Sequence, residues 1–257
     1  MVRKILYRDN LEVLVFDTEQ ETGAAGAIEG GRIINRTIKT RGYCRIIFAA
    51  AVSQHETLKA LSLNDSIAWD KVIAFHMDEY FGIPQGDNRS LASFFNAYPK
   101  IRPDKFHFLN STARNKEEEC LRYSELLKEK PIDVVFCGIG DNGHLAFNEP
   151  HAALFNDPVW VKMVEIDNVS KQQQVNAGNF PNIGAVPSEA YTLTIPALMS
   201  GAFLICIAPS HYKAEAVKNI LSGPVSEKYP ASVMRRHKKA LLYLDSESAE
   251  NIQGIFD

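Results

Sequence analysis

The sequence predicts an α/β fold, with an open, doubly wound, mostly parallel sheet of Rossmann-like type and helices on both faces. Short apolar runs rich in Ile, Val, Phe and Leu recur along the chain, and each is too short for a useful helix. Strands that are buried on both faces show this pattern, because helices cover both sides of a parallel sheet. The runs expected to form strands are 45–51, 72–77, 133–137, 202–208 and 240–244.

Stretches with helical spacing separate these runs, which favours strands that alternate with helices. Segments 116–130 and 211–222 each gather their apolar residues on one stripe, and Gly223-Pro224 ends the second. A third helix is expected to begin at Ser53, because Glu56 three residues later completes a capping-box pattern.

Segment 151–186 differs from the rest of the chain. It contains turn signals such as Asn156-Asp157-Pro158 and a polar run at 171–174. We expect it to form a lid over a crevice, although an ordinary surface excursion would have the same composition.

Composition and charge exclude several classes of protein. The chain has 257 residues, 46% of them apolar, and a net charge of −3, so it offers no basic face for nucleic acid. No apolar run is long enough to span a membrane, and the charged N-terminus lacks the apolar segment of a secretory signal. We expect one domain over residues 1–257 in the cytoplasm, with a small molecule as its partner. Homo-oligomerisation stays open.

The cysteines predict neither a metal site nor a disulfide framework. Cys120 and Cys137 form the closest pair, and they are 137 − 120 = 17 positions apart, which excludes a CxxC unit. Cys137 and Cys206 lie inside apolar runs, so we expect both to be small buried side chains of a reduced protein.

Ligands of open α/β sheets bind at the carboxyl ends of the strands, and unusual residues follow three of the predicted strands. Asp78 and Glu79 come after 72–77. A carboxylate at the end of a buried strand lies in surroundings of low dielectric constant, where it can act as a base on a carbon-bound proton. An Asp that only stabilises a turn or caps a helix would give the same sequence pattern.

The second candidate is segment 138–150, GIGDNGHLAFNEP, directly after 133–137. Gly138, Gly140 and Gly143 allow close backbone approach to a polar ligand. His144 can transfer protons near neutral pH, and Glu149 is a candidate to orient its ring. The combination of glycines, His and acid at a strand end predicts a functional loop.

The third candidate is the turn at 50–54, where Ser53 and Gln54 stand at the expected start of a helix. Free N–H groups at such a start can hold a phosphate, but the turn contains no glycine and is not a P-loop. A simple capped helix would explain it equally well. Lys213 could add a cation at the same rim, although most isolated lysines are merely solvated.

Met77-Asp78-Glu79-Tyr80 together with 138–150 resembles the glucosamine-6-phosphate deaminase/isomerase family, which shares its fold with 6-phosphogluconolactonases. The likeness continues through 213–217 and 229–232, so it covers roughly residues 40–245. It implies a metal-free and cofactor-free aldose–ketose isomerisation of an amino-sugar phosphate, coupled to loss of ammonia. Whether the sugar is glucosamine or its galactosamine epimer stays open.

The resemblance also implies roles for individual residues. Asp78 matches the base that moves a proton between C2 and C1, His144 matches the residue that assists ring opening, and Glu149 matches its supporting carboxylate. Asn142 stands where many relatives carry Asp and others Asn. The substrate-binding residues are expected to be Ser53, Gln54, Glu79, Gly138, Gly140, Gly143 and Lys213.

Two departures from the family pattern concern the phosphate. The Gly-Gly-Thr-Pro-like turn of relatives is replaced by Ala-Ala-Val-Ser-Gln at 50–54, and Gly178 stands where many relatives place an Arg. Lys213 does match a phosphate-binding Lys. Two alternatives therefore stay open: a 6-phosphogluconolactonase-like lactone hydrolase and a non-catalytic sugar-phosphate-binding module. Lactonases resemble one another in a DER-like motif and lack the AFNEP ending, which favours the deaminase.

Overall fold

A mixed sheet crosses the molecule in the order β1-β2-β11-β10-β7-β3-β4-β6. The structure is a computed structural model that describes residues 2–101, 104–252 and 254–256. All neighbours pair in parallel except β1 and β2, which form an antiparallel hairpin at one edge. The strands are β1 (Lys4–Arg8), β2 (Leu11–Val15), β3 (Cys44–Phe48), β4 (Val72–His76), β6 (Phe106–His107), β7 (Val134–Cys137), β10 (Phe203–Ile207) and β11 (Ala240–Leu244).

The five predicted strands are confirmed as β3, β4, β7, β10 and β11. Alternate residues of these strands enter two different hydrophobic cores, one on each face of the sheet. In β7, for example, Val135 and Cys137 enter one core, while Val134 and Phe136 enter the other. Burial on both faces explains why the strands appear in the sequence as continuous apolar runs.

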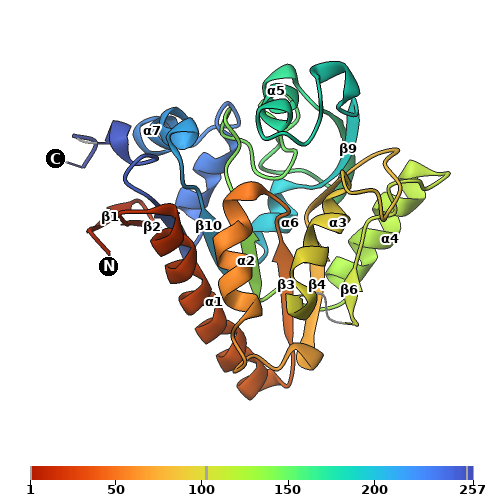
Figure 1. Cartoon of the computed structure of the whole chain (residues 1–257), viewed down its shortest axis with the longest axis horizontal. Coiled ribbons are helices and arrows are strands. Elements are labelled where there is room, and N and C mark those ends of the chain that lie inside the picture. The colour runs from red at the N-terminus through yellow and green to blue at the C-terminus, as the bar shows by residue number, and fades with distance from the viewer. Residues whose placement is uncertain (1, 102–103, 253, 257) are drawn as a thin grey trace.

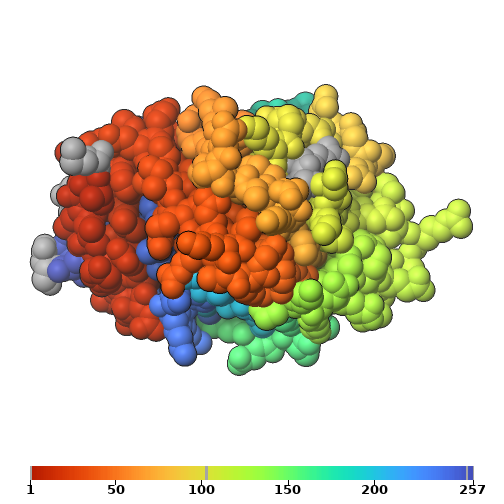
Figure 2. Space-filling view, turned by 90° about the horizontal axis from the view of Figure 1, so that it is seen from below, coloured from red at the N-terminus to blue at the C-terminus, as the bar shows by residue number. Residues whose placement is uncertain are grey.

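Helices cover both faces, as predicted. The long α1 (Glu19–Arg41) packs beside α2 (His55–Ser62) over one face, where both are seen in Figure 1. The other core contains buried residues of α4 (Lys116–Lys128), α6 (Ile195–Met199) and α7 (Ala214–Ser222). Figure 2 views the end of the molecule remote from α5, with the first residues (red) and the α4 region (yellow-green) on opposite sides.

A second, antiparallel sheet lies beyond the carboxyl end of β4, and the sequence did not predict it. Its strand order is β5-β9-β8, with β5 (Asp78–Tyr80), β9 (Glu189–Leu193) and β8 (Val161–Glu165). A third hydrophobic core forms around it and includes Tyr80, Phe147 and Phe180. The short α3 (Leu91–Phe94) packs against β5.

The predicted start of the third helix is wrong. Residues Val52–Gln54 form a separate 3₁₀ turn, α2 begins at His55, and no side chain caps either element. The Ser53 hydroxyl instead accepts a hydrogen bond from Gln54 Nε2 at 3.1 Å. The predicted burial of Cys137 and Cys206 is confirmed, and all four cysteines are free in this structure.

The glycines of α1 allow the helix to approach the sheet closely. A Cβ at Gly30 would lie 2.4 Å from Cζ of Phe136, a fully buried ring that stacks on Phe48. We expect Gly30→Ala to lower the free energy of unfolding by about 1–3 kcal/mol, because overpacking outweighs the gain in helix propensity. The measurement is urea unfolding. Ile28→Ala, at an exposed site of the same helix, is the control and should change it by less than about 0.5 kcal/mol.

Candidate active site

A cavity of about 420 Å³ opens at the carboxyl ends of β3, β4, β7 and β10. The chain runs from β3 to β4 on one side and returns through β7 on the other, so loops diverge at this point of the sheet. Six of the predicted site residues line this cavity, although they come from four different segments of the chain. They are Ser53, Asp78, Gly138, Gly140, His144 and Lys213.

The other predicted site residues lie behind the cavity wall. Gln54 is fully buried and donates to the carbonyl of Ile207 at 3.2 Å. Glu79, Asn142, Gly143 and Glu149 are likewise absent from the lining. For Gln54, Glu79 and Gly143 the predicted contact with substrate stays a prediction, and in this structure their contacts are with the protein around the cavity.

Asp78 begins β5, which pairs with β9 and holds the side chain at the cavity. Its side chain is nearly buried, at 9% exposure for the residue. Burial, together with the nearby Glu79 carboxylate, raises the pKa of Asp78 to about 8. An acid of this kind can hold or release a proton near neutral pH, which is what a base for a carbon-bound proton requires.

Glu79 has a different role from its neighbour. Its carboxylate accepts hydrogen bonds from the backbone N–H groups of Tyr80, Leu91 and Ala92 at 2.8–2.9 Å. Burial raises the pKa of Glu79 to about 7, while these three donors oppose the rise. The carboxylate therefore fixes the start of α3 beside the cavity.

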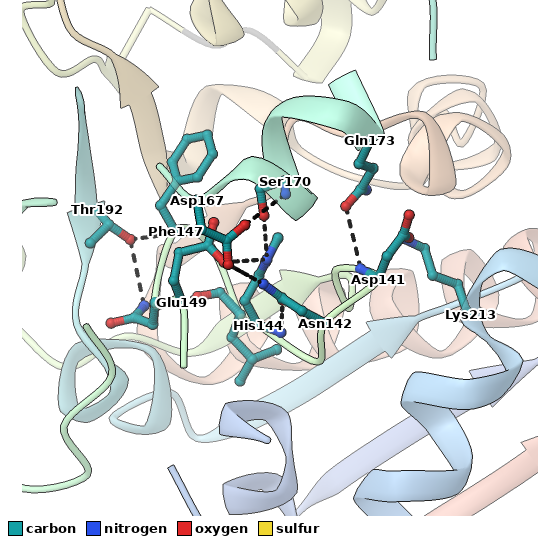
Figure 3. Close-up of polar contacts among 12 residues, drawn as sticks. Asp141, Asn142, His144, Phe147, Glu149, Asp167, Ser170, Gln173, Thr192 and Lys213 are labelled. Carbon is teal, nitrogen blue, oxygen red and sulfur yellow. Dashed lines mark hydrogen bonds and ion pairs between the residues drawn. The ribbon is translucent and has the colours of Figure 1, made fainter. Parts of the chain in front are cut away.

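His144 is held from behind by a buried carboxylate (Figure 3). Its Nδ1 lies 3.2 Å from Oε2 of the fully buried Glu149 and 3.1 Å from the Ser170 hydroxyl. Burial alone would raise the pKa of Glu149, but His144 and the hydrogen bonds of Ser170 and Asn142 outweigh it and lower that pKa to about 2. Glu149 is thus an anion that orients the ring and leaves Nε2 for a ligand.

Asn142 joins this cluster to the segment predicted as a lid. Its Nδ2 donates to Glu149 Oε2 at 2.6 Å and to Asp167 Oδ2 at 2.9 Å. Its Oδ1 accepts from the backbone N–H of His144 at 3.1 Å. A neutral amide suits this position, because it donates to two carboxylates that would repel a third.

Two glycines are required by the geometry of this loop. A Cβ at Gly140 would lie 2.1–2.4 Å from three atoms of the His144 ring. Gly143 has a φ of +85°, in the left-handed region. The loop therefore brings its own backbone against the ring that it presents to the cavity.

Gly140→Ala is expected to displace His144 and break its contact with Glu149. We expect kcat for the reaction proposed below to fall by about 10²-fold, in the range that removal of a general acid–base group produces. Steady-state kinetics measures this. The control is Gly184→Ala, at an exposed site with an ordinary φ, which should leave kcat unchanged. Equal kcat for both variants would contradict the packing argument.

Ser53 and Lys213 line the cavity from β3 and β10. Lys213 belongs to the 3₁₀ turn His211–Lys213 before α7, and its Nζ donates to Asp141 Oδ1 at 2.6 Å. A Cβ at Gly138 would lie 2.9 Å from the Ser53 hydroxyl, so this glycine lets the two loops meet. A hydroxyl and an ammonium that line one cavity are suitable ligands for an oxyanion.

The predicted lid segment contains β8, α5 (Asn168–Asn176) and the 3₁₀ turn Ile183–Ala185. The end of α5 and the residues after it reach the cavity, and Figure 1 places α5 above the sheet. Gly178 follows α5 with a φ of +76° and does not line the cavity. The residues of this segment that do are Gln173, Gln174, Asn176, Ala177 and Asn179.

Three polar residues of the site were not predicted from the sequence. Asp141 was an available signal, because it is an acid in the glycine-rich loop next to Asn142. Asp167 and Ser170 carried no local signal, because they lie 25 and 26 positions from Asn142 and His144, the residues they contact. Only the tertiary fold brings them together.

Two features are absent from residues 2–101, 104–252 and 254–256. Within these ranges, no three His, Cys, Asp or Glu side chains stand together in a way that could hold a metal ion. No helix in this part of the chain has the length and apolar character needed to cross a membrane.

Comparison with known proteins places the chain in a family. The family described as glucosamine-6-phosphate isomerases/6-phosphogluconolactonase matches residues 17–243. A glucosamine-6-phosphate deaminase of Listeria monocytogenes is 33% identical over 231 residues, which cover 89% of this chain and 96% of the relative. One of Bacillus cereus is 30% identical over 240 residues, which cover 93% and 88%.

Solved structures agree with this placement. A monomeric glucosamine-6-phosphate deaminase superposes with a TM-score of 0.84 at 28% identity, over 93% of this chain and 99% of that one. A 6-phosphogluconolactonase from Shewanella baltica has the same fold, with a TM-score of 0.74 at 15% identity, over 96% and 100%. The resemblance noted in the sequence is confirmed, and the chain belongs to the glucosamine-6-phosphate isomerase/6-phosphogluconolactonase family.

Proposed function

We propose that this protein is an enzyme that converts an amino-sugar 6-phosphate, glucosamine-6-phosphate or its galactosamine epimer, to the ketose 6-phosphate and ammonia. One observation carries the proposal: Asp78 and His144 line the same cavity from strand ends on either side of β3. The names of the relatives that match most of the chain support the same activity.

The first proposed step is the opening of the sugar ring, assisted by His144. A proton must leave the hydroxyl at C1 while the ring oxygen gains one, and an imidazole can serve in both directions near neutral pH. Glu149 behind the ring, 3.2 Å from Nδ1, orients the imidazole for this transfer.

The second step is the transfer of a proton from C2 to C1 of the open sugar. Asp78 in its ionised form takes the C2 proton while the oxygen at C1 takes a proton from the C2 ammonium group of the substrate, which gives an enolamine with an O–H at C1, and the protonated acid then delivers a proton to C1. The nitrogen at C2 becomes an iminium group. Water adds to C2, the C–N bond breaks, and ammonia and the ketose leave, so one water is consumed for each ammonia released. These steps use side chains of this chain and water, and no cofactor enters the proposal.

The phosphate is assigned to the wall formed by Ser53 and Lys213, which line the cavity together. Segment 151–186 is proposed to act as the lid, because the end of α5 reaches the cavity and α5 also supplies Ser170 to His144. A lid of this kind would hold the open sugar against Asp78 and His144 while the enolamine exists.

The test is ammonia release by the purified protein, offered glucosamine-6-phosphate and galactosamine-6-phosphate separately. Saturable release from either sugar supports the proposal and identifies the epimer. Rapid hydrolysis of 6-phosphogluconolactone, with no ammonia from either amino sugar, would instead establish the lactonase alternative. Tight binding of the sugar phosphates without any product would establish a binding module.

A further inference from the structure

The basic side chains that line the cavity form ion pairs with acidic side chains of the same chain. Among the described residues that line it, Arg89 and Lys213 are the lysines and arginines, and each is paired with an acid. Arg89 forms a fork with Asp87, and its side chain is half exposed. Lys213 has only 10% of its side chain exposed and lies against Asp141.

Asp141 occupies the place that an anionic ligand of Lys213 would take. Its Oδ1 lies 2.6 Å from Nζ, and its side chain also lines the cavity, where Figure 3 shows the two residues reaching toward each other. A phosphate bound to Nζ would bring two negative charges next to this carboxylate, and like charges at such a distance repel strongly in a partly buried site. The carboxylate and the phosphate therefore compete for Lys213.

The backbone of Asp141 does not need to move for this exchange. Its N–H donates to Gln173 Oε1 of α5 at 3.3 Å, which ties the loop to the predicted lid while the side chain remains a quarter exposed. Rotation of one side chain is enough to free Lys213. The adjacent Asn142 keeps its own contacts with Glu149 and Asp167.

We propose that Asp141 is a specificity-determining residue that acts as an internal competitor for the phosphate subsite at Lys213. This inference rests on the proposed function and adds a residue that the sequence analysis did not assign. Every ligand that places an anion on Lys213 must displace Asp141, whereas an unphosphorylated sugar that contacts only the Asp78 and His144 side of the cavity does not. Asp141 therefore lowers the affinity of all such anionic ligands by the same factor and leaves the affinity of unphosphorylated sugars unchanged.

The size of the effect follows from competition. If Asp141 holds Lys213 in at least about nine molecules of ten, the apparent phosphate affinity is reduced by about tenfold or more. Asp141→Asn removes the competing charge and retains a side chain of similar size. It is expected to bind inorganic phosphate about tenfold more tightly than the wild type, and to lower KM for the amino-sugar 6-phosphate without raising kcat.

The experiment is calorimetric titration of inorganic phosphate into the wild type, D141N, D87N and the double variant D141N/K213Q. D87N is the matched control, because it frees the other cation of the cavity in the same chemical way. The gain should appear in D141N, should be absent in D87N, and should disappear in the double variant. Affinity for glucosamine, which lacks the phosphate, should differ by less than about twofold between the wild type and D141N. Thermal unfolding checks that each variant is folded.

Two results would overturn the inference: an unchanged or weaker phosphate affinity in D141N, or an equal gain in D87N. Because phosphate binding is measured without turnover, these results are distinct from failure of the proposed function. That failure would be a wild-type protein that binds phosphate and releases no ammonia from either amino sugar.

Discussion

Asp78→Asn is expected to lower kcat for ammonia release by about 10²–10⁴-fold, because an amide cannot take the proton from C2. The same change is expected to stabilise the protein. Burial makes ionisation of Asp78 costly, which is the reason for its pKa of about 8, and Asn has no charge to bury. Loss of activity together with gain of stability is typical of a catalytic group whose burial destabilises the folded protein.

The gain in stability of D78N over the wild type is expected to increase with pH. The pKa of Asp78 is about 8 in the folded protein and near its ordinary value of 3.8 in the unfolded chain, so between these values the folded state binds more protons. Wild-type stability from this group therefore falls as the pH rises from about 4 to 8. The stability difference between D78N and the wild type should grow over the same range, to on the order of 5 kcal/mol near pH 8.

Thermal unfolding at several pH values, together with steady-state kinetics at each, measures both effects. Glu79→Gln separates the two neighbouring acids. An amide can replace only one of the two oxygens that accept backbone N–H groups, so this variant should lose stability by about 1–3 kcal/mol where D78N gains it. A D78N protein with wild-type turnover would show that another group takes the C2 proton.

Glu149→Gln is expected to lower kcat by about 10²-fold, because His144 loses the buried anion that orients its ring. The shape of the side chain is preserved, so the effect comes from charge and hydrogen bonding. Glu165→Gln, at an exposed site on β8, is the matched control and should leave kcat unchanged. Equal kcat in the two variants would remove Glu149 from the mechanism.

Glu149 also predicts a stability effect opposite in sign to that of Asp78. Its pKa is about 2 in the folded protein, below its ordinary value of 4.5, so the stabilisation is present above pH 4.5 and is lost as the pH falls toward 2. The wild type should therefore be more stable than E149Q at pH 7, by about 1–3 kcal/mol, with a smaller difference near pH 3. Urea unfolding at the two pH values measures this.

The parallel strands could be predicted because burial on both faces produces continuous apolar runs, as in β7 and β10. Helix α1 was not predicted, because Gly23, Gly26, Gly30 and Gly31 weaken the helical pattern in sequence. In the structure, a Cβ at Gly23, Gly26 or Gly30 would lie within 2.5 Å of a neighbouring side chain. The small antiparallel sheet was missed for another reason, since β5 has only three residues and finds its partner more than a hundred positions later.

In the site, too, some residues could be predicted from local sequence and others could not. Asp78 and His144 could be found because each follows a buried strand, and strand ends at the switch point converge on one cavity. Contacts such as Asp141 with Lys213 depend on segments that are far apart in sequence, and no local pattern specifies which acid meets which cation. The prediction that Ser53 caps the helix was wrong, because its hydroxyl accepts a hydrogen bond from the Gln54 side chain and not from a backbone N–H at the start of the helix.

The central claim is that a side chain of this cavity carries a proton from C2 to C1 of an amino-sugar phosphate. The most direct test is to run the reaction in D₂O and to examine C1 of the ketose product by NMR. Proton transfer through Asp78, which exchanges with solvent in an open cavity, predicts deuterium at C1 and loss of this product in D78N. A ketose formed with no deuterium at C1, at a rate unchanged in D78N, would contradict the account, because it would require a direct shift of hydrogen between the two carbons.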